Sequence, residues 1–217
     1  MIRLLPQLIH KKHIIFDYNG TILYDTEVCV EVLNELLNSH DKPSVTEHFY
    51  RDHFHFPISS FYKNIGFDFQ RESFEDLGHR YMSQYFNNLH RCRIYSGLRD
   101  LLVELRKNKI KTSILTALNH QALHEQLLHF QLESHFDAAF GLPDHKAHSK
   151  IARGHELMNH MGFLPEETLI IGDTDHDLEV GINLNIDVIL LADGHQSEQR
   201  LQKTNARLIN LNRQTEL

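Results

Sequence analysis

The chain has 217 residues, with 22 Lys and Arg against 29 Asp and Glu, so its formal net charge is −7. This acidic balance disfavours nucleic acid and anionic membranes as partners, because phosphate-backbone binding depends on clustered Lys and Arg. The opening MIRLLPQLIHKKHIIFD is too polar for a signal peptide, and no apolar run approaches the roughly 18 residues of a membrane span. Cys29 and Cys92 stand in no C-x-x-C pattern. We therefore expect a cytoplasmic protein with free thiols.

Several short runs rich in Ile, Leu and Val are predicted to form strands that are buried on both faces. These runs cover residues 13–17, 112–116, 137–140, 168–172 and 187–191. Segments with helical spacing of apolar residues lie between the later runs. Asn108 and Gly162, which tolerate the left-handed cap conformation, mark the ends of two of these helices. Alternating strands and helices predict an α/β fold with a doubly wound parallel sheet.

The stretch from about Tyr24 to Tyr95 contains no strand-like apolar run. Its first part carries apolar residues at helical spacing, and Asp25 or Thr26 is placed to cap the start of that helix. We therefore predict an all-helical cap of residues 24–95, inserted into a core formed by residues 1–23 and 96–217.

Histidine is unusually frequent, with 18 residues, and alternates with Phe in the segment 48–56. Metal binding is one interpretation of that segment. The familiar zinc spacings, however, need cysteines or an H-x-x-x-H pair with a third ligand. We interpret the segment as a half-exposed amphipathic stretch instead.

Polar residues follow four of the predicted strands, at the edge of a parallel sheet where ligand sites lie. They are the stretches Asp17-Tyr18-Asn19-Gly20-Thr21, Thr116-Ala117-Leu118-Asn119, Asp144 to Lys150, and Gly172-Asp173 through Asp177. Carboxylates from two strands would repel each other unless a cation lies between them, and hard oxygen ligands favour Mg²⁺. A hydroxyl, a lysine and turn amides at the same place would bind an anion. Together these groups indicate phosphoryl transfer through an aspartyl-phosphate.

In the order of these motifs the chain resembles the haloacid dehalogenase superfamily of phosphohydrolases, within it the phosphoglycolate phosphatase-like branch. The matching stretches are IIFDYNGTILYDTE, ILTALN, a lysine ahead of a helix, and IIGDTDHD. The resemblance covers nearly the whole chain. It implies a Rossmann-like core with a helical cap, and Mg²⁺-dependent hydrolysis of a small phosphorylated metabolite.

The resemblance also implies a role for each matching residue. Asp17 would attack phosphorus and bind Mg²⁺, together with Asp173 and the main-chain carbonyl of Asn19. Asp177 would hold a water on the metal or orient Lys150. The phosphoryl oxygens would be bound by the Thr116 hydroxyl, by Lys150 or alternatively Lys146, and by main-chain amides near Tyr18, Asn19 and Ala117. Asp175 has no implied role, and we expect it to face solvent.

Asn19 departs from the family pattern. The family's phosphatases carry an aspartate there, which acts as general acid and then as general base. An amide performs neither step, and general acid–base catalysis typically contributes about 10²–10⁴-fold in rate. We therefore expect Asp17 to be phosphorylated by substrates with good leaving groups, while hydrolysis of the aspartyl-phosphate is slow.

Two alternatives stay open. The family's haloacid dehalogenases also lack the second aspartate, but they also lack the Gly-Asp that this chain keeps at Gly172-Asp173. A degenerate member that binds a phosphorylated ligand or a protein partner without turnover is the other alternative. Retention of Asp17, Thr116, a lysine, Asp173 and Asp177 opposes it.

Substrate choice is expected to belong to the cap. Its candidate residues are Arg51, Lys63, Arg71, Arg80 and the His/Phe segment. The run from Gly194 to Ser197 is expected to cap the final helix rather than approach the site. The pattern assigns no oligomeric state.

Overall fold

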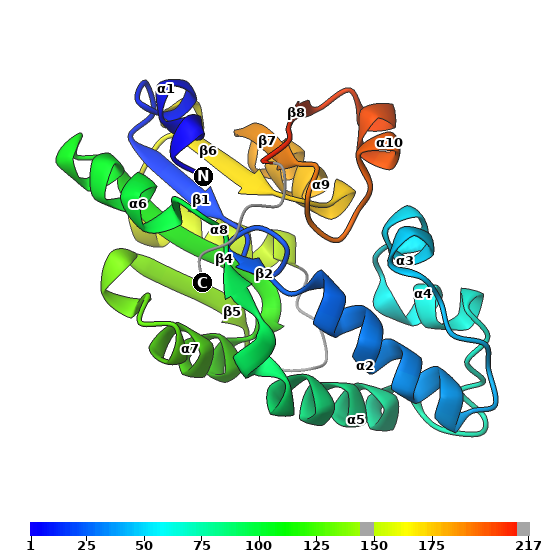
Figure 1. The fold of residues 1–217 in the computed structure, drawn as a ribbon. Helices are drawn as coiled ribbons and strands as arrows, with labels where there is room; N and C mark the ends of the chain where they lie inside the picture. Colours follow the sequence, from blue (N-terminus) through cyan, green and yellow to red (C-terminus); the bar gives the residue numbers. More distant parts are fainter. Residues whose placement is uncertain (144–149, 212–217) are drawn as a thin grey trace.

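The computed structural model describes residues 1–143 and 150–211. Its centre is a six-stranded sheet with the strand order β5-β4-β1-β6-β7-β8, in which every neighbouring pair is parallel (Figure 1). The strands are β1 (His13–Phe16), β4 (Lys111–Asn119), β5 (Ala138–Leu142), β6 (Thr168–Gly172), β7 (Asp187–Leu191) and β8 (Arg207–Ile209). The predicted α/β fold is confirmed, and each predicted run forms a strand. The edge strand β8 was not predicted, because three residues carry no usable hydrophobic pattern.

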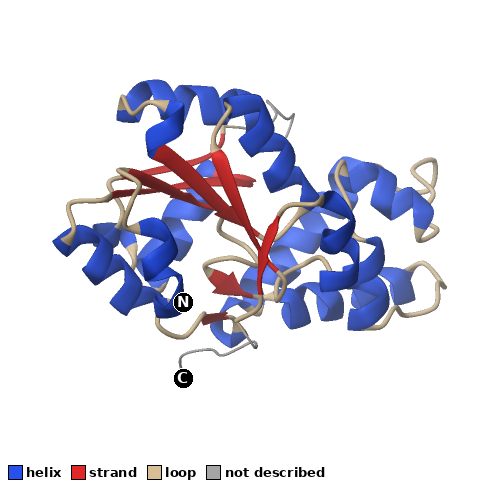
Figure 2. Cartoon of the chain, turned by 90° about the horizontal axis from the view of Figure 1, so that it is seen from above, coloured by secondary structure: helices blue, strands red, loops and turns tan. Residues whose placement is uncertain are grey.

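Helices cover both faces of this sheet (Figure 2). They are α1 (Leu5–Leu8), α6 (Leu98–Lys107), α7 (His120–His129), α8 (Lys150–Met161) and α9 (Asp175–Leu184). The short helix α10 (Glu198–Leu201) follows the loop after β7. Along β1, Ile14 and Phe16 pack into the cluster that includes apolar residues of α1, α6 and α7. Ile15 packs into the cluster formed with α8 and α9. This alternation between faces is why the strand is apolar at every position.

The segment of residues 26–91 is helical and lies to one side of the sheet (Figure 1). Its helices are α2 (Thr26–Ser39), α3 (Glu47–His53), α4 (Ile58–Asn64) and α5 (Phe74–Asn87). They enclose a separate apolar cluster that includes Leu33, Leu36, Phe61 and Leu77. Two unpredicted two-residue strands, β2 (Leu23–Tyr24) and β3 (Arg93–Ile94), pair antiparallel where the segment begins and ends. The division into core and cap at residues 24 and 95 stays a prediction.

Of the two predicted left-handed residues at helix ends, Gly162 adopts that conformation and Asn108 does not. Gly162 follows α8 with a φ of +72°, as expected for a left-handed cap. After α6, the left-handed residue is Lys109, with a φ of +59°, and Asn108 before it keeps a negative φ. Within the described residues, no helix combines the length and apolar character needed to cross a membrane.

Candidate active site

Three buried carboxylates meet at the carboxyl edge of the sheet. Asp17 follows β1, Asp173 follows the neighbouring strand β6, and Asp177 lies in the first turn of α9. One carboxylate oxygen from each lies within 4.8 Å of the others. The side-by-side parallel pairing of β1 and β6 produces this meeting, because it aligns Phe16 with Ile171 and so brings both strand ends to the same level.

Hydrogen bonds fix two of these carboxylates in place. Asp177 Oδ2 accepts from the amides of Asp173 and Thr174, at 3.1 and 3.0 Å, and from the Thr174 hydroxyl at 2.7 Å. This capping box explains why a Thr precedes α9 and an Asp follows three residues later. Asp173 accepts from the Thr21 hydroxyl at 3.0 Å and from the His195 amide at 2.6 Å.

Lys150 joins the carboxylates. It begins α8, is only 4% exposed, and donates from Nζ to Oδ1 of Asp17 and, at 2.5 Å, to Oδ1 of Asp177. Lys150 is therefore the lysine that the described structure brings into the site, whereas Lys146 lies outside the described residues. The contact with Asp177 agrees with the orienting role that was one of the two expected for that acid.

Burial controls the electrostatics of this group. Burial raises the pKa of Asp17 to about 8. The charge of Lys150 opposes this rise, and repulsion from Asp177 and Asp173 adds to it. Burial also raises the pKa of Asp173 to about 6, against the influence of His195. Burial alone would raise the pKa of Asp177 as well, but Lys150 and the Thr174 hydroxyl lower it. Conversely, burial opposes the charge of Lys150, while the two acids raise its pKa.

The residues fit a divalent cation such as Mg²⁺. When ionised, three carboxylates against one ammonium leave two negative charges in a buried site. Their oxygens are the hard ligands that Mg²⁺ prefers. The main-chain carbonyl of Asn19, the further expected ligand, accepts no hydrogen bond from the described residues. The wall of the site is closely packed, since a Cβ on either Gly20 or Gly194 would lie 2.2 Å from Asp173 Oδ2.

The expected phosphate-binding groups lie around the end of β1. Thr116 is buried in β4, the strand next to β1, close to where the β4·β5 register shifts between Leu115 and Asn119. Such irregularities are common beside active sites. The Thr116 hydroxyl accepts from the Leu118 amide at 3.2 Å and makes no described contact with the three carboxylates.

Main-chain amides supply the other expected phosphate contacts. The amides of Tyr18 and Asn19 donate to no group among residues 1–143 and 150–211, so they are available to an anion. The Tyr18 side chain is fully buried, and its hydroxyl finds no partner there. Ala117 is half-buried in β4 and offers only its main chain.

The Asn19 side chain donates hydrogen bonds to two buried groups. Its amide nitrogen donates to Oδ2 of Asp25 at 2.7 Å and to the Tyr85 hydroxyl at 3.1 Å. An aspartate at this position would bring a second carboxylate against Asp25. The amide avoids that repulsion, but it also leaves position 19 without a transferable proton.

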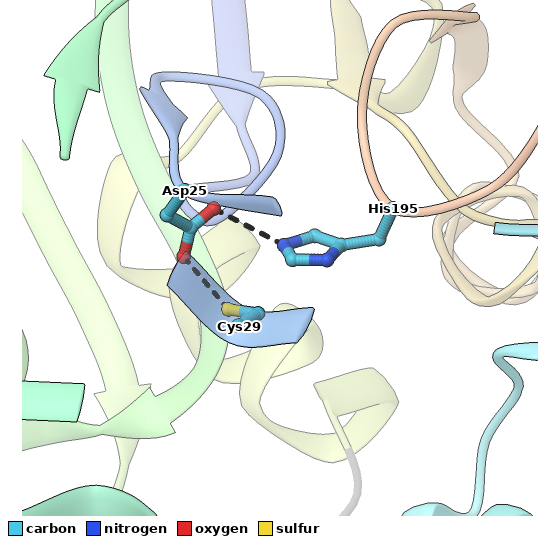
Figure 3. A group of neighbouring side chains, drawn as sticks. All are labelled: Asp25, Cys29 and His195. Atoms are coloured by element: carbon cyan, nitrogen blue, oxygen red, sulfur yellow. Dashed lines mark hydrogen bonds and ion pairs between the residues drawn. The ribbon is translucent and has the colours of Figure 1, made fainter. Parts of the chain in front are cut away.

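Asp25 and His195 are the site residues that the sequence reasoning missed. They face each other with Cys29, which donates to Asp25 at 3.5 Å, as Figure 3 shows. His195 Nε2 lies 3.2 Å from Asp25 Oδ1, and its Nδ1 lies 3.0 Å from the Tyr50 hydroxyl. The ligand atoms of Asp25, Cys29 and His195 lie within 4.8 Å of one another, and each of these side chains already has a protein partner.

Asp25 and His195 each shift the pKa of the other toward the charged form. Burial alone would lower the pKa of His195, but Asp25 raises it to about 9. Burial would raise the pKa of Asp25, but the charge and hydrogen bond of His195 lower it. Asp25 was interpreted as a helix cap, and it does occupy the N-cap position of α2, yet its carboxylate makes no cap hydrogen bond. Gly194 to Ser197 combine two functions, because Ser197 caps α10 as expected whereas His195 enters the site.

The cationic side chains proposed for substrate choice are occupied by the protein itself. Arg51 donates to main-chain carbonyls of the loop after β7, and Lys63 lies 5.4 Å from the centroid of the Phe69 ring. Arg71 pairs with Asp41 and Arg80 with Glu72.

Two further expectations concern Asp175 and the His/Phe segment. Asp175 does not simply face solvent, because it pairs with Arg200 at 2.6 Å and accepts from Gln196 at 2.8 Å. The His/Phe segment, which forms α3 and the turn after it, is half-exposed as expected. His48 pairs with Asp52 in it, and Tyr50 is buried.

Comparison with known proteins shows related sequences and folds. Residues 14–191 match the family model of haloacid dehalogenase-like hydrolases. The tyrosine-protein kinase PtkA of Mycobacterium tuberculosis is 24% identical over 117 residues, which span 54% of this chain but only 40% of that protein. A protein named pyrophosphatase PpaX, from Caldanaerobacter subterraneus, is 21% identical over 172 residues, 76% of this chain and 74% of that protein. A haloacid dehalogenase-like family hydrolase from Streptococcus pneumoniae has the same fold, with a TM-score of 0.79, 19% identity, and coverage of 93% and 94% of the two chains.

Proposed function

Because the chain belongs to the haloacid dehalogenase-like hydrolase family, we propose that it hydrolyses phosphate monoesters of small metabolites through a phosphorylated Asp17. The observation that carries this proposal is the meeting of Asp17, Asp173, Asp177 and Lys150 in one buried group. Such a group offers a nucleophile, ligands for Mg²⁺ and a cation for the phosphoryl oxygens.

In the proposed reaction, an Asp17 oxygen attacks phosphorus and the bond from phosphorus to the ester oxygen breaks. The leaving alcohol takes its proton from solvent, because the Asn19 amide has none to give. Water then attacks the phosphorus of the aspartyl-phosphate, releasing phosphate and restoring the Asp17 carboxylate. In this proposal Lys150, Thr116 and the amides of Tyr18 and Asn19 would bind the phosphoryl oxygens; Lys150 contacts Asp17, and the two amides have no main-chain acceptor among the described residues. Mg²⁺, held by Asp17 and Asp173, would neutralise charge on the phosphoryl group.

The engagement of Asn19 supports a slow second step. A carboxamide is not basic enough to activate water, and the Asn19 amide nitrogen is engaged as a donor to Asp25 and Tyr85. We therefore expect a burst of released alcohol, followed by slow steady-state turnover. A single phase at ordinary phosphatase speed would show that another group supplies the base.

Replacing Asn19 by Asp provides the sharper test. The new carboxyl group would lie beside Asp25, whose negative charge raises the pKa of the new acid and favours its protonated form. That proton is what a general acid needs. We expect steady-state turnover to rise several-fold or more and the burst to shrink, measured by rapid mixing with nitrophenyl phosphate. An unchanged rate would contradict the assigned role of position 19.

The same assay separates the proposal from the other readings. Nitrophenol release that requires Mg²⁺ and is lost in Asp17→Asn supports the phosphatase. Tight binding of phosphorylated ligands without any release would indicate a binding protein. Metal-independent release of halide from a haloacid would indicate a dehalogenase. A screen of small phosphorylated metabolites then identifies the substrate.

A further inference from the structure

The loop that follows β7, residues 192–197, packs against Asp173 of the carboxylate group. The His195 amide donates to Asp173 Oδ2 at 2.6 Å, so this loop orients one of the two expected metal-binding side chains. Gly194 packs so closely on the same oxygen that no side chain fits there. A shift of this loop would therefore move Asp173.

Helix α3 holds the same loop through Arg51. Arg51 Nε donates to the Gly194 carbonyl at 2.8 Å, and its Nη2 donates to the carbonyls of Ala192 and Gln196 at 2.7 and 3.4 Å. In return the Arg51 carbonyl accepts from the Ser197 amide at 3.0 Å. Figure 1 shows this loop, before α10, extending toward α3.

Side chains add two further ties between α3 and the loop. The Tyr50 hydroxyl lies 3.0 Å from His195 Nδ1, and Gln196 Nε2 donates to the Phe54 carbonyl at 3.0 Å. His195 is thus held at its ring by Asp25 and Tyr50, while its amide holds Asp173. The partners of the Arg51 side chain among the described residues are main-chain carbonyls of this loop. An arginine bound this way fixes loop conformation through directed donors.

We propose that Arg51 is a positioning residue for the metal site: by bracing the 192–197 loop it holds Asp173 in the orientation that binds Mg²⁺. This inference rests on the proposed function, because it assumes that Asp173 binds the metal. Groups that orient metal ligands commonly change metal affinity by about 10–100-fold when removed. Coupling of this kind is reciprocal, so metal binding must also stabilise the docked position of α3.

The test measures metal affinity rather than activity. Calorimetric titration with Mg²⁺ or Mn²⁺ gives Kd for the wild type and for Arg51→Ala, and circular dichroism checks that the variant is folded. We expect Kd to rise about tenfold or more in Arg51→Ala, and Arg51→Lys to recover only part of the loss because it lacks the fork of donors.

Arg200→Ala is the matched control. Arg200 also joins α3 to the core, through the Asp52 carbonyl at 3.3 Å and Asp175 at 2.6 Å, but its side chain does not bind the loop carbonyls. We expect its Kd to stay within about twofold of the wild type, since it reaches the 192–197 loop only indirectly, through Asp175 and Gln196, and not at the carbonyls beside His195. A folded Arg51→Ala protein with the wild-type Kd would overturn the inference and leave the proposed function intact. A wild type that binds neither metal would overturn both.

Hydrogen exchange on the wild type covers the case in which Arg51→Ala fails to fold. Amide exchange across residues 47–54 is followed with and without Mg²⁺. We expect the metal to slow exchange there, whereas exchange at the distant helix α7 should not change. Equal exchange in residues 47–54 under both conditions would contradict the coupling.

Discussion

The two ends of the central strands bury polar groups in opposite ways. At the amino end of β1, His13 is fully buried, and its Nε2 lies 2.8 Å from the Ser113 hydroxyl of the neighbouring strand. Burial lowers its pKa to about 4, so it is neutral at physiological pH. At the carboxyl end, Asp17 lies against Asp173 and Asp177, with Lys150 as the ammonium that bridges two of them.

The two ends of the sheet therefore differ in how their buried polar groups affect stability. His13 and Ser113 at the amino end satisfy each other as neutral hydrogen-bonding partners, which costs little free energy. The carboxylates at the carboxyl end repel one another, an arrangement that is typical of functional sites. Four substitutions or changes of condition test whether the contrast is real.

The largest effect is expected for Asp17→Asn. Removing the nucleophile should lower turnover by about 10⁴-fold or more. At the same time it removes one of the mutually repelling carboxylates, while Lys150 keeps its bond to Asp177. We therefore expect the melting temperature of the metal-free protein to stay the same or to rise. A variant that loses activity together with several degrees of Tm would indicate that Asp17 is structural instead.

Lys150→Met is expected to be the most destabilising single change. It leaves Asp17 and Asp177 buried without their shared cation, and breaking a buried ion pair costs about 3–5 kcal/mol. Urea unfolding at neutral pH measures this loss. Lys107→Met, which breaks an exposed pair with Glu104, is the control and should cost well under about 1 kcal/mol.

The pH dependence of the metal-free protein tests the carboxyl end. Folding raises the pKa values of Asp17 and Asp173 above the unfolded value of 3.8. The folded protein therefore holds more protons than the unfolded chain below pH 8, and its stability should increase as the pH falls from 8 to 6, by about 2–3 kcal/mol. Unfolding in a chelator should show this slope, and Asp17→Asn or Mg²⁺ should reduce it. An identical slope in Asp17→Asn would show that Asp17 is not the source of this pH dependence.

The amino end should respond to pH in the opposite direction, with a smaller effect. Folding lowers the pKa of His13 from 6.5 to about 4. Below pH 6.5 the unfolded chain binds the proton and the folded protein does not, so stability falls as the pH decreases toward 4. We expect His13→Gln to flatten this loss by about 1–2 kcal/mol between pH 6.5 and 5. If the two proteins lose stability in parallel, His13 is not the responsible group.

Much of the fold follows from local pattern. The runs around Ile14, Ile114 and Ile170 are continuous in apolar residues because the parallel sheet is covered on both faces. Lys109 shows the limit of that method, because it adopts the left-handed conformation that Asn108 was expected to take. One-residue shifts at helix ends leave little trace in a hydrophobic pattern.

The site was predictable where it depends on strand order. Asp17 and Asp173 directly follow neighbouring strands, and Asp177 lies in the first turn of the helix after β6, so the topology brings all three to one edge. Asp25 and His195 were not predictable in this way. They are 170 residues apart, and their meeting depends on how the helical segment and the loop after β7 pack against each other. Asp25 also precedes α2 at a position typical of a helix cap. That local role accounts for an Asp at this position and gives no sign of its contact with His195.

The central claim is that the Asp17 carboxylate takes the phosphoryl group. Rapid acid quenching of the enzyme mixed with Mg²⁺ and nitrophenyl phosphate, followed by peptide mapping, tests it directly. We predict a phosphoryl group on the peptide that carries Asp17, formed within the burst and absent from Asp17→Asn. Nitrophenol release in the wild type without a phosphorylated peptide, or with phosphate on another residue, would contradict the account.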